Sequence, residues 1–164
     1  MRKYMKLFAV ICACLLICSC AQKKYRSDVS CRELCDLAQK SIDDGLEYEE
    51  YGESHLKYEF GDGALGADDF CIVYSVKVED INEIGVFFAD GEERVKEIAK
   101  DCREYLEDMR ENKSAFISSY APLEMPKLDR AGVRVYGNYV IYAVTDEDLA
   151  ENAFEEIEKR LTVR

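Results

Sequence analysis

The sequence predicts a single α+β domain in which an antiparallel sheet of about four strands packs against helices, in the order α-ββ-α-ββ-α. Three observations predict this class. Two pairs of β-rich segments, at 70–89 and 133–145, are each joined by a short turn. A long amphipathic helical pattern separates the two pairs, and shorter helical patterns precede and follow them. The chain has 164 residues, of which 48% are hydrophobic and 34% charged, and this composition suits one globular core.

Residues 1–19 predict a signal peptide for export. Arg2, Lys3 and Lys6 precede an apolar run of 13 residues, Leu7 to Ser19, and the whole segment contains no acidic residue. The run is shorter than the ~20 residues that a membrane-spanning helix needs. A buried N-terminal helix is the alternative interpretation, but a basic start without acids is typical of an export signal.

Cys20 is the predicted lipidation site. It follows Leu16–Ser19, which resembles the lipobox of bacterial lipoproteins: aliphatic residues, then smaller ones, then an obligatory cysteine. Cys14 would leave a hydrophobic segment of only seven residues, and Cys18 follows the bulky Ile17. We therefore expect diacylglycerol on Cys20 to anchor the protein in the lipid bilayer, on the extracytoplasmic face of the cell membrane.

The charge of the chain disfavours nucleic acid as a partner. Lys and Arg number 22 against 34 Asp and Glu, and removal of residues 1–19 would change the net charge from −12 to −15. The predicted tether at 20–29 is locally basic, with Lys23, Lys24 and Arg26, so it either favours an anionic bilayer or is an ordinary polar linker. The acidic domain at 30–164 suits a cationic or neutral partner in the cell envelope.

Four cysteines remain once the signal peptide is removed and Cys20 is acylated: Cys31, Cys35, Cys71 and Cys102. Export permits disulfides, and four cysteines allow three pairings that the sequence does not rank. Cys31 and Cys35 nevertheless share the apolar face of a predicted helix, and a C-x-x-x-C spacing is typical of neither zinc nor redox sites. We favour buried unpaired thiols over one or two disulfides, and both over metal binding or catalysis.

The first predicted helix follows the tether. Ser30 and Glu33 form a capping box, which predicts a helix from 31 to about Asp44 that ends at Gly45. The next segment, Gly45–Asp69, holds eight acidic residues and one lysine without a clear hydrophobic period. It predicts a variable loop with at most one short strand or one turn of helix.

A hairpin and a long helix follow the acidic segment. Alternating apolar residues predict a half-buried strand over Phe70–Val78, and the apolar Ile84–Ala89 predicts a central strand that pairs with it through the turn Asp80–Glu83. A helix then begins at Asp90 and continues to Tyr120, which at 1.5 Å per residue makes it about 40 Å long. Its predicted buried stripe is Val95, Ile98, Ala99, Cys102, Tyr105, Leu106, Met109 and Phe116.

The clearest hairpin lies near the C-terminus. Val133–Tyr136 and Tyr139–Thr145 are β-rich and are separated by Gly137 and Asn138, a pair typical of a tight two-residue turn. Thr145 then resembles a cap for the last helix, together with Asp148. Apolar residues at helical spacing predict the buried face of this helix: Leu149, Ala153, Phe154, Ile157 and Leu161.

Three motifs resemble a known family. NEIGVFFADG (Asn82–Gly91) leads into the long charged helix, Tyr120–Pro122 follows that helix, and GNYVIYAV (Gly137–Val144) forms the second hairpin. Together they are similar to domain of unknown function DUF4358, a family of small Gram-positive lipoproteins, over about 70–157. The family has no assigned reaction, so the resemblance implies no catalytic, cofactor-binding or metal-binding residue. The segment Gly45–Asp69 departs from the family's pattern.

Candidate sites besides Cys20 are few. His55 beside Glu53 is either a base partnered by a carboxylate or a solvent-exposed loop histidine, and we favour the second. The oxygens of Gly61–Gly63, Asp68 and Asp69 either ligate Ca²⁺ or belong to a solvated charged loop, which again is favoured. Four aromatic residues among these acids either form an exposed surface for a cationic or sugar-like partner or cover the core: Tyr48, Tyr51, Tyr58 and Phe60.

Two functions fit these patterns. We favour a non-catalytic binding or accessory module of the cell envelope, because the chain has one histidine and no recognisable catalytic motif, and we expect no cofactor and no metal. The alternative is an envelope hydrolase that uses carboxylates or a thiol, with His55 or a cysteine in a cleft. A carboxylate hydrolase would need two acids that converge in one pocket.

Overall fold

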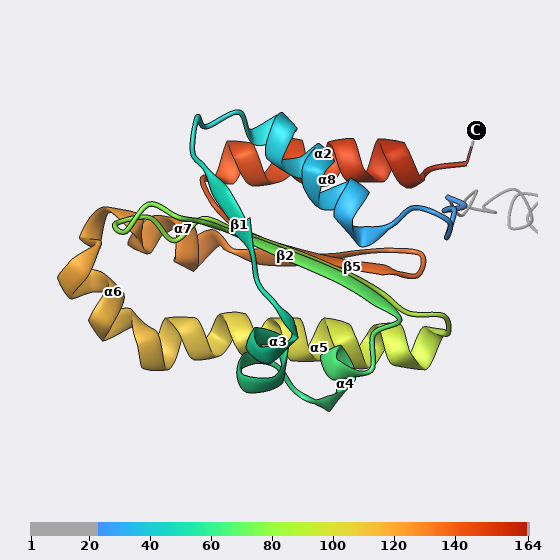
Figure 1. Cartoon of the computed structure of the whole chain (residues 1–164), viewed down its shortest axis with the longest axis horizontal. Coiled ribbons are helices and arrows are strands. Elements are labelled where there is room, and N and C mark those ends of the chain that lie inside the picture. The colour runs from blue at the N-terminus through green and yellow to red at the C-terminus, as the bar shows by residue number, and fades with distance from the viewer. Residues whose placement is uncertain (1–22, 164) are drawn as a thin grey trace, which may run out of the picture.

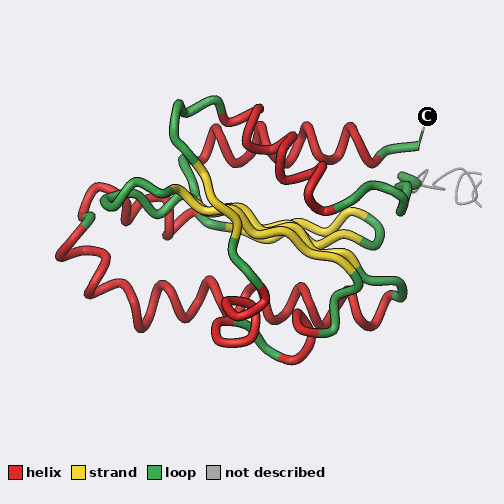
Figure 2. The backbone as a smooth tube through the Cα atoms, viewed as in Figure 1, coloured by secondary structure: helices red, strands yellow, loops and turns green. Residues whose placement is uncertain are grey.

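The computed structural model describes residues 23–163 and shows the predicted α+β class. A five-stranded antiparallel sheet lies between two helical layers (Figure 1, Figure 2). Helices α2 (Cys31–Ile42) and α8 (Glu147–Leu161) cover one face, and α5 (Glu92–Asp108) covers the other. The predicted signal peptide and Cys20 lie outside the described residues. Within 23–163, no helix is long and apolar enough to span a bilayer.

The sheet contains both predicted hairpins and one additional strand. Strand β2 (Asp69–Ser75) pairs with β3 (Glu83–Phe88), and β4 (Gly132–Tyr136) pairs with β5 (Tyr139–Val144). Antiparallel pairing of β3 with β5 joins the hairpins into the order β1-β2-β3-β5-β4. The fifth strand, β1 (Tyr48–Glu50), pairs with β2 at the edge of the sheet. The predicted number of four strands is therefore one too few.

The central strands β3 and β5 are buried on both faces, as the apolar pattern of Ile84–Ala89 predicts. On one side Val86 and Ile141 pack in a core with residues of α2 and α8. On the other side Phe87 and Tyr142 pack in a second core with residues of α5. Successive buried apolar residues of β3 and β5 therefore belong to alternate cores, according to the face on which each side chain lies.

Ser30 caps α2 as predicted, but Glu33 does not complete a capping box, because its carboxylate pairs with Arg160. The helix also ends earlier than predicted. The Ser30 Oγ accepts a hydrogen bond of 3.2 Å from the Glu33 backbone amide. The helix ends at Ile42, where Asp43 takes the left-handed conformation at φ 44° and donates its backbone N–H to the Gln39 carbonyl. Aspartate tolerates this conformation better than most residues. The chain has therefore left the helix before it reaches Gly45.

The acidic segment 45–69 is more ordered than predicted. Besides β1 it contains two short helices, α3 (Glu53–Glu59) and α4 (Asp62–Leu65). Leu56, Phe60 and Ala64 are buried in the core on the α5 side of the sheet. Both short helices and the turn between them therefore contribute buried side chains to this core, while most acids of the segment stay exposed.

The predicted long helix is interrupted. A π-helical turn, η1 (Met109–Lys113), separates α5 from α6 (Ser114–Tyr120), and α6 leaves the line of α5 (Figure 1). A π turn inserts one extra residue and so shifts the faces of the helix that follows. As a result Ile117 is buried, whereas Phe116, which the stripe predicts to be buried, is 69% exposed. The prediction for Phe116 is therefore wrong.

Two short helices connect α6 to the second hairpin, and the last helix begins without its predicted cap. The 3₁₀ turn η2 (Pro122–Glu124) and α7 (Met125–Arg130) connect α6 to β4. Helix α8 has Asp146 at its N-cap and no capping side-chain hydrogen bond. The Thr145 Oγ1 is instead buried without a hydrogen-bond partner in the described chain, because Thr145 lies at the end of the buried strand. The predicted cap at Thr145 with Asp148 is therefore wrong.

The described part of the predicted tether packs on the C-terminus of α8. The Arg26 backbone amide donates to the Leu161 carbonyl at 2.8 Å, and the Val163 amide donates to the Lys24 carbonyl at 2.9 Å. Lys23 forms an ion pair of 2.7 Å with Glu158. Arg26 pairs with Asp28, so two of the three tether cations have intramolecular partners. Residues 23–29 are therefore part of the folded domain.

We predict that Gly85→Ala destabilises the protein by about 1–3 kcal/mol, because a methyl group there overpacks a buried sheet. A Cβ on Gly85 would lie 2.0 Å from a ring carbon of Tyr142. Urea unfolding measures the effect as a lower midpoint. Gly132→Ala is the matched control, since its Cβ would lie 3.6 Å from its nearest neighbour. Equal unfolding midpoints for the two variants would contradict the prediction.

Candidate functional site

A pocket of about 320 Å³ lies beside the start of β3 and is the candidate site. Tyr51, His55 and Glu59 line one side, Tyr105 and Lys113 come from α5 and η1, and the β2–β3 connection closes the other side. Three hollows, of about 560, 560 and 400 Å³, are larger. The first two are lined by no buried ionisable side chain, and the third is lined by the buried Asp101, which accepts a hydrogen bond from the Ala64 backbone amide. The smaller pocket is lined by Glu83, which is only 5% exposed and has no backbone partner for its carboxyl within residues 23–163. Such a group in a concave site favours this pocket.

The Glu83 carboxyl is held by two tyrosine hydroxyls. Tyr105 of α5 donates a hydrogen bond of 3.0 Å to Glu83 Oε1, and Tyr142 of β5 donates to the same oxygen. Within residues 23–163 no basic side chain forms an ion pair with Glu83, and Oε2 accepts no hydrogen bond. Burial raises the pKa of Glu83 to about 7. The group can therefore take up or release a proton near neutral pH.

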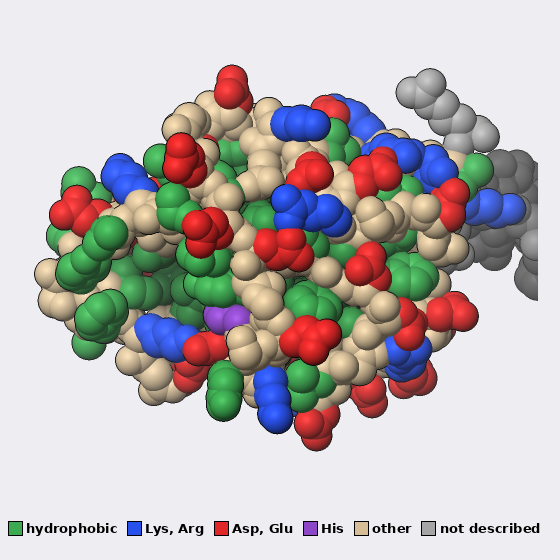
Figure 3. Space-filling view, in the orientation of Figure 1, with side chains coloured by type: hydrophobic (Ala, Val, Ile, Leu, Met, Phe, Trp, Pro, Cys, Tyr) green, Lys and Arg blue, Asp and Glu red, His purple; other side chains and the backbone are tan. Residues whose placement is uncertain are grey.

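Aromatic rings form one wall of the pocket. His55 stacks on Tyr51 with ring centroids 3.6 Å apart, and Tyr51 stacks on Tyr74 with centroids 3.9 Å apart. Burial lowers the pKa of His55, and its Nε2 is buried without a hydrogen-bond partner in the described chain. Figure 3 shows this histidine in a hollow that hydrophobic side chains border. A ring held in this way is fixed in the wall and is neutral at pH 7.

The prediction of a solvent-exposed loop histidine at position 55 is therefore wrong, and Glu53 is not its partner. The residue lies in α3 and is half-buried, so it is not a solvent-exposed loop histidine. It forms no ion pair or hydrogen bond with Glu53, and the charged groups that act on its pKa are Glu59 and Lys113. The two short helices of the acidic segment bring it to the pocket, and the sequence showed no period that would place them.

The π turn supplies one rim of the pocket. Met109 and Lys113, its first and last residues, both line the pocket. Lys113 pairs with Glu59 and lies over the Tyr105 ring, with Nζ 5.5 Å from the ring centroid. π turns occur often at functional sites because they re-aim the side chains of one helical turn. Here the turn brings the Lys113 ammonium and the Met109 thioether to the same pocket.

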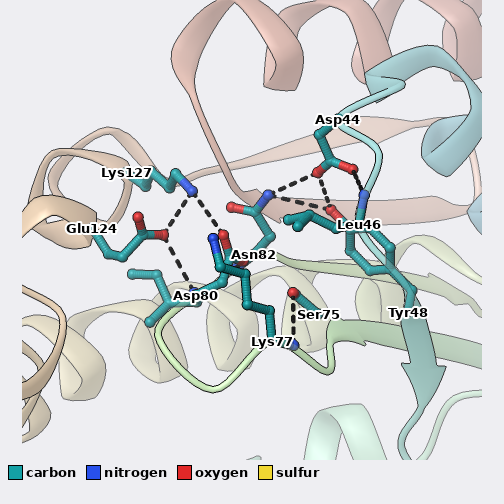
Figure 4. Close-up of polar contacts among 10 residues, drawn as sticks. Asp44, Leu46, Tyr48, Ser75, Lys77, Asp80, Asn82, Glu124 and Lys127 are labelled. Atoms are coloured by element: carbon teal, nitrogen blue, oxygen red, sulfur yellow. Dashed lines mark hydrogen bonds and ion pairs between the residues drawn. The ribbon is translucent and has the colours of Figure 1, made fainter.

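A buried ion-pair network fixes the opposite rim (Figure 4). Lys127 pairs with Asp80 at 3.2 Å and with Glu124 at 2.6 Å, and none of these three side chains is more than 14% exposed. Glu124 also accepts a hydrogen bond from the Ile81 backbone amide. Breaking a buried ion pair leaves an uncompensated charge, so the network resists opening. It holds the β2–β3 connection against α7.

Asn82 closes the same rim from the other end (Figure 4). Its Nδ2 donates to Asp44 at 2.9 Å and to the Tyr48 hydroxyl at 3.3 Å, while the Tyr48 hydroxyl itself donates to Asp44. These bonds fix the orientation of the amide. Its Oδ1 is buried and has no hydrogen-bond partner in the described chain. The rim is therefore preformed but has one unused acceptor.

The acids proposed from the sequence as Ca²⁺ ligands do not lie together in the structure. Asp68 pairs with Arg94 at 2.8 Å, and Asp69 accepts a hydrogen bond from the Cys31 backbone amide. Asp62 lies in the first turn of α4. Among residues 23–163 no three potential metal-ligating side chains gather to hold an ion. The side chains of Asp62, Asp68 and Asp69 therefore do not converge with a third ligating side chain in the described chain.

The four aromatic residues of the acidic segment divide between surface and core. Tyr58 is 83% exposed, Phe60 is buried, and Tyr48 and Tyr51 are half-buried. The proposed exposed aromatic surface is therefore reduced to one ring. Tyr51 instead contributes to the pocket wall, which the sequence did not indicate.

The four described cysteines are buried, free thiols, as the helical spacing predicts. The Cys35 Sγ donates to the Cys71 carbonyl at 3.3 Å, and the Cys31 Sγ donates to the Asp69 carbonyl at 3.4 Å. Burial raises the pKa of Cys31, Cys35 and Cys102, so little reactive thiolate forms at neutral pH. None of the four lines the pocket.

Sequence reasoning missed Glu83, Tyr105, Tyr142 and Lys113 as site residues. The sequence pattern places Glu83 in a turn and Tyr105 on the buried face of a helix, where it predicts packing alone. The sequence contains one signal for Glu83. This acid directly precedes the apolar run Ile84–Ala89, so it is buried if the central strand begins at position 83. The partners of Glu83 lie 22 and 59 residues away, so only the fold identifies them.

Comparison with known proteins gives one match. A family model described as domain of unknown function (DUF4358) matches residues 40–145. This range includes the whole pocket and excludes the predicted lipidation site. No curated protein matched, and no solved structure matched.

We predict that Glu83→Gln gains stability over the wild type as the pH rises from 5 to 8. The pKa of Glu83 is about 7 in the native protein and has an ordinary value of 4.5, so the native state binds this proton more tightly. Its contribution is fully present below pH 4.5 and is lost as the pH rises through 7. The difference corresponds to about 3 kcal/mol, and Gln keeps an acceptor for both tyrosines.

Urea unfolding at several pH values measures this difference. Glu104→Gln is the control, because Glu104 lies on the same helix α5 and its side chain is 63% exposed. Its stability should keep a constant offset from the wild type. If Glu83→Gln also keeps a constant offset from pH 5 to 8, the Glu83 carboxyl does not titrate near neutrality.

Proposed function

We propose a function from the premise that this chain belongs to the family described as domain of unknown function DUF4358. The proposal is a non-catalytic binding or accessory module of the bacterial cell envelope. Diacylglycerol on Cys20 would anchor it to the extracytoplasmic face of the membrane. Its partner would be a cationic or neutral envelope component, because the exported chain would carry a net charge of −15.

The preformed pocket at Glu83 carries this proposal. Ion pairs and hydrogen bonds fix both rims, so a ligand would meet an ordered site and little ordering entropy would oppose binding. The pocket lining contains no cysteine, and the hydroxyl of Tyr105 is engaged with Glu83. These features favour binding over nucleophilic catalysis.

The arrangement of the chain supports anchoring at Cys20. The N-terminal segment enters beside the C-terminus, at the opposite end of the long axis from α6 and the β2–β3 connection (Figure 1). The pocket is lined by Asp80, Ile81 and Asn82 of that connection. A lipid on Cys20 would therefore hold one end of the domain at the bilayer and leave the pocket accessible from outside.

A carboxylate hydrolase is the second candidate. Glu59, Asp80 and Glu83 all line the pocket, which meets the requirement for converging acids. A pKa near 7 would also suit Glu83 to act as a general acid. The two other acids are already paired with lysines, which disfavours their use as a base. A thiol hydrolase loses support because the described cysteines are buried away from the pocket.

We predict that Cys20→Ala releases the protein from the membrane into the extracytoplasmic fluid. The thiol of Cys20 is the proposed attachment point of the acyl chains, and the remaining chain is acidic. Fractionation of cells and medium measures the distribution. Cys18→Ala is the control and should leave the protein with the membranes. If Cys20→Ala still sediments with membranes, the lipoprotein proposal is wrong.

We predict that the purified chain releases no soluble fragments from isolated bacterial cell walls. The proposed module binds without chemistry, so the wild type and Glu83→Gln should give the same background. Chromatography of the supernatant measures release. Fragments that the wild type and Glu104→Gln both release, but Glu83→Gln does not, would establish the carboxylate hydrolase instead.

A further inference from the structure

We infer that the Glu83 pocket binds a small organic cation that carries a primary ammonium group. This inference rests on the proposed function, because it takes the pocket as a ligand site and specifies the chemistry of its ligand. Three sets of contacts carry it: the charge balance of the lining, the unused hydrogen-bond acceptors, and the aromatic wall.

Glu83 is the acid of the lining that no cation of the described chain neutralises. Glu59 pairs with Lys113, and Asp80 pairs with Lys127. Glu83 receives only the two neutral hydroxyls. An ionised carboxylate in a buried site is costly unless a cation accompanies it. A ligand ammonium would supply the missing positive charge, whereas an anionic ligand would be repelled.

The unused acceptor sites of Glu83 match the donors of a primary ammonium. Both tyrosine hydroxyls donate to Glu83 Oε1, and no bond within residues 23–163 reaches Oε2. An ionised carboxylate oxygen can accept two hydrogen bonds, so Oε2 keeps both of its lone pairs for a ligand. An ammonium group offers three N–H donors and no acceptor. A quaternary ammonium has no such donor and could not use this oxygen.

The aromatic wall suits the organic part of such a ligand. The Lys113 ammonium lies 5.5 Å from the Tyr105 ring centroid, so this ring already holds one cation from the chain itself. Tyr51 is stacked between His55 and Tyr74, so both of its faces are covered and its ring edge is left to line the pocket. These rings offer apolar surface to a short alkyl chain. With a volume of about 320 Å³, the pocket fits a ligand at the small end of the usual range.

A titration of the full chain in detergent with n-butylammonium chloride tests the inference, with n-butanol as the neutral probe. Amide chemical shifts in a ¹⁵N-labelled sample report binding, and the expected result is saturable shifts at pocket residues with n-butylammonium alone. Glu83→Gln should weaken this binding at least about tenfold, because it removes the charge while keeping an acceptor. Glu104→Gln should bind as the wild type does.

Proton release provides a second measurement on the wild type, which needs no variant to fold. The groups that face Glu83 are Tyr105 and Tyr142, which donate to it, and Glu59, His55 and Lys113, which line the same pocket. A bound ammonium favours the ionised form of Glu83, so binding at pH 7 should release protons. Calorimetry in two buffers of different ionisation enthalpy measures the release.

The outcomes separate this inference from the proposed function. If n-butanol saturates the same residues as well as n-butylammonium does, the ammonium inference is wrong and the pocket remains a ligand site. If Glu83→Gln binds n-butylammonium unchanged, the inference is also wrong. If neither probe shifts any pocket residue, both the inference and the role of the pocket in the proposed function fail. Release of Cys20→Ala from membranes tests the anchor independently of all three.

Discussion

The pairing of β3 with β5 is the contact on which the rest of the structure depends. Both strands are buried on both faces, so the sheet needs a helical layer on each side. Close packing at the centre is possible because Gly85 has no side chain where the Tyr142 ring lies. That ring in turn places its hydroxyl on Glu83. The same pair of strands therefore sets both the layering of the fold and the chemistry of the pocket.

Much of the fold could be predicted from the sequence because its signals are local. The Ser30 N-cap, the Gly137–Asn138 turn and the apolar run at Ile84 each depend on neighbouring residues, and all three are present in the structure. The failures have physical causes as well. A π turn changes the phase of a helix without any signal in hydrophobicity, which is why Phe116 was misplaced. Strand β1 has three residues, too few to show alternation.

The pocket could not be predicted because it is assembled from distant parts of the chain. His55, Glu83 and Lys113 belong to α3, β3 and η1, and each is unremarkable in its own sequence context. The sequence shows only the neighbours of His55 along the chain, such as Glu53. In the fold its closest ring is Tyr51, and its electrostatic neighbours are Glu59 and Lys113. Charge and composition limited the classes of partner, but the uncompensated carboxyl emerged only from the packing of the two tyrosines around it.

The docking of residues 23–26 on α8 limits how far an anchored domain could lie from the bilayer. The described structure begins at Lys23, whose ion pair with Glu158 ties it to the last helix. Three peptide links separate Cys20 from Lys23, and they span at most about 11 Å. A lipid on Cys20 would therefore keep the domain against the bilayer, unable to sweep outward as it would on a flexible stalk. A ligand of the pocket would then be captured close to the membrane surface, at the end of the domain that faces away from the bilayer.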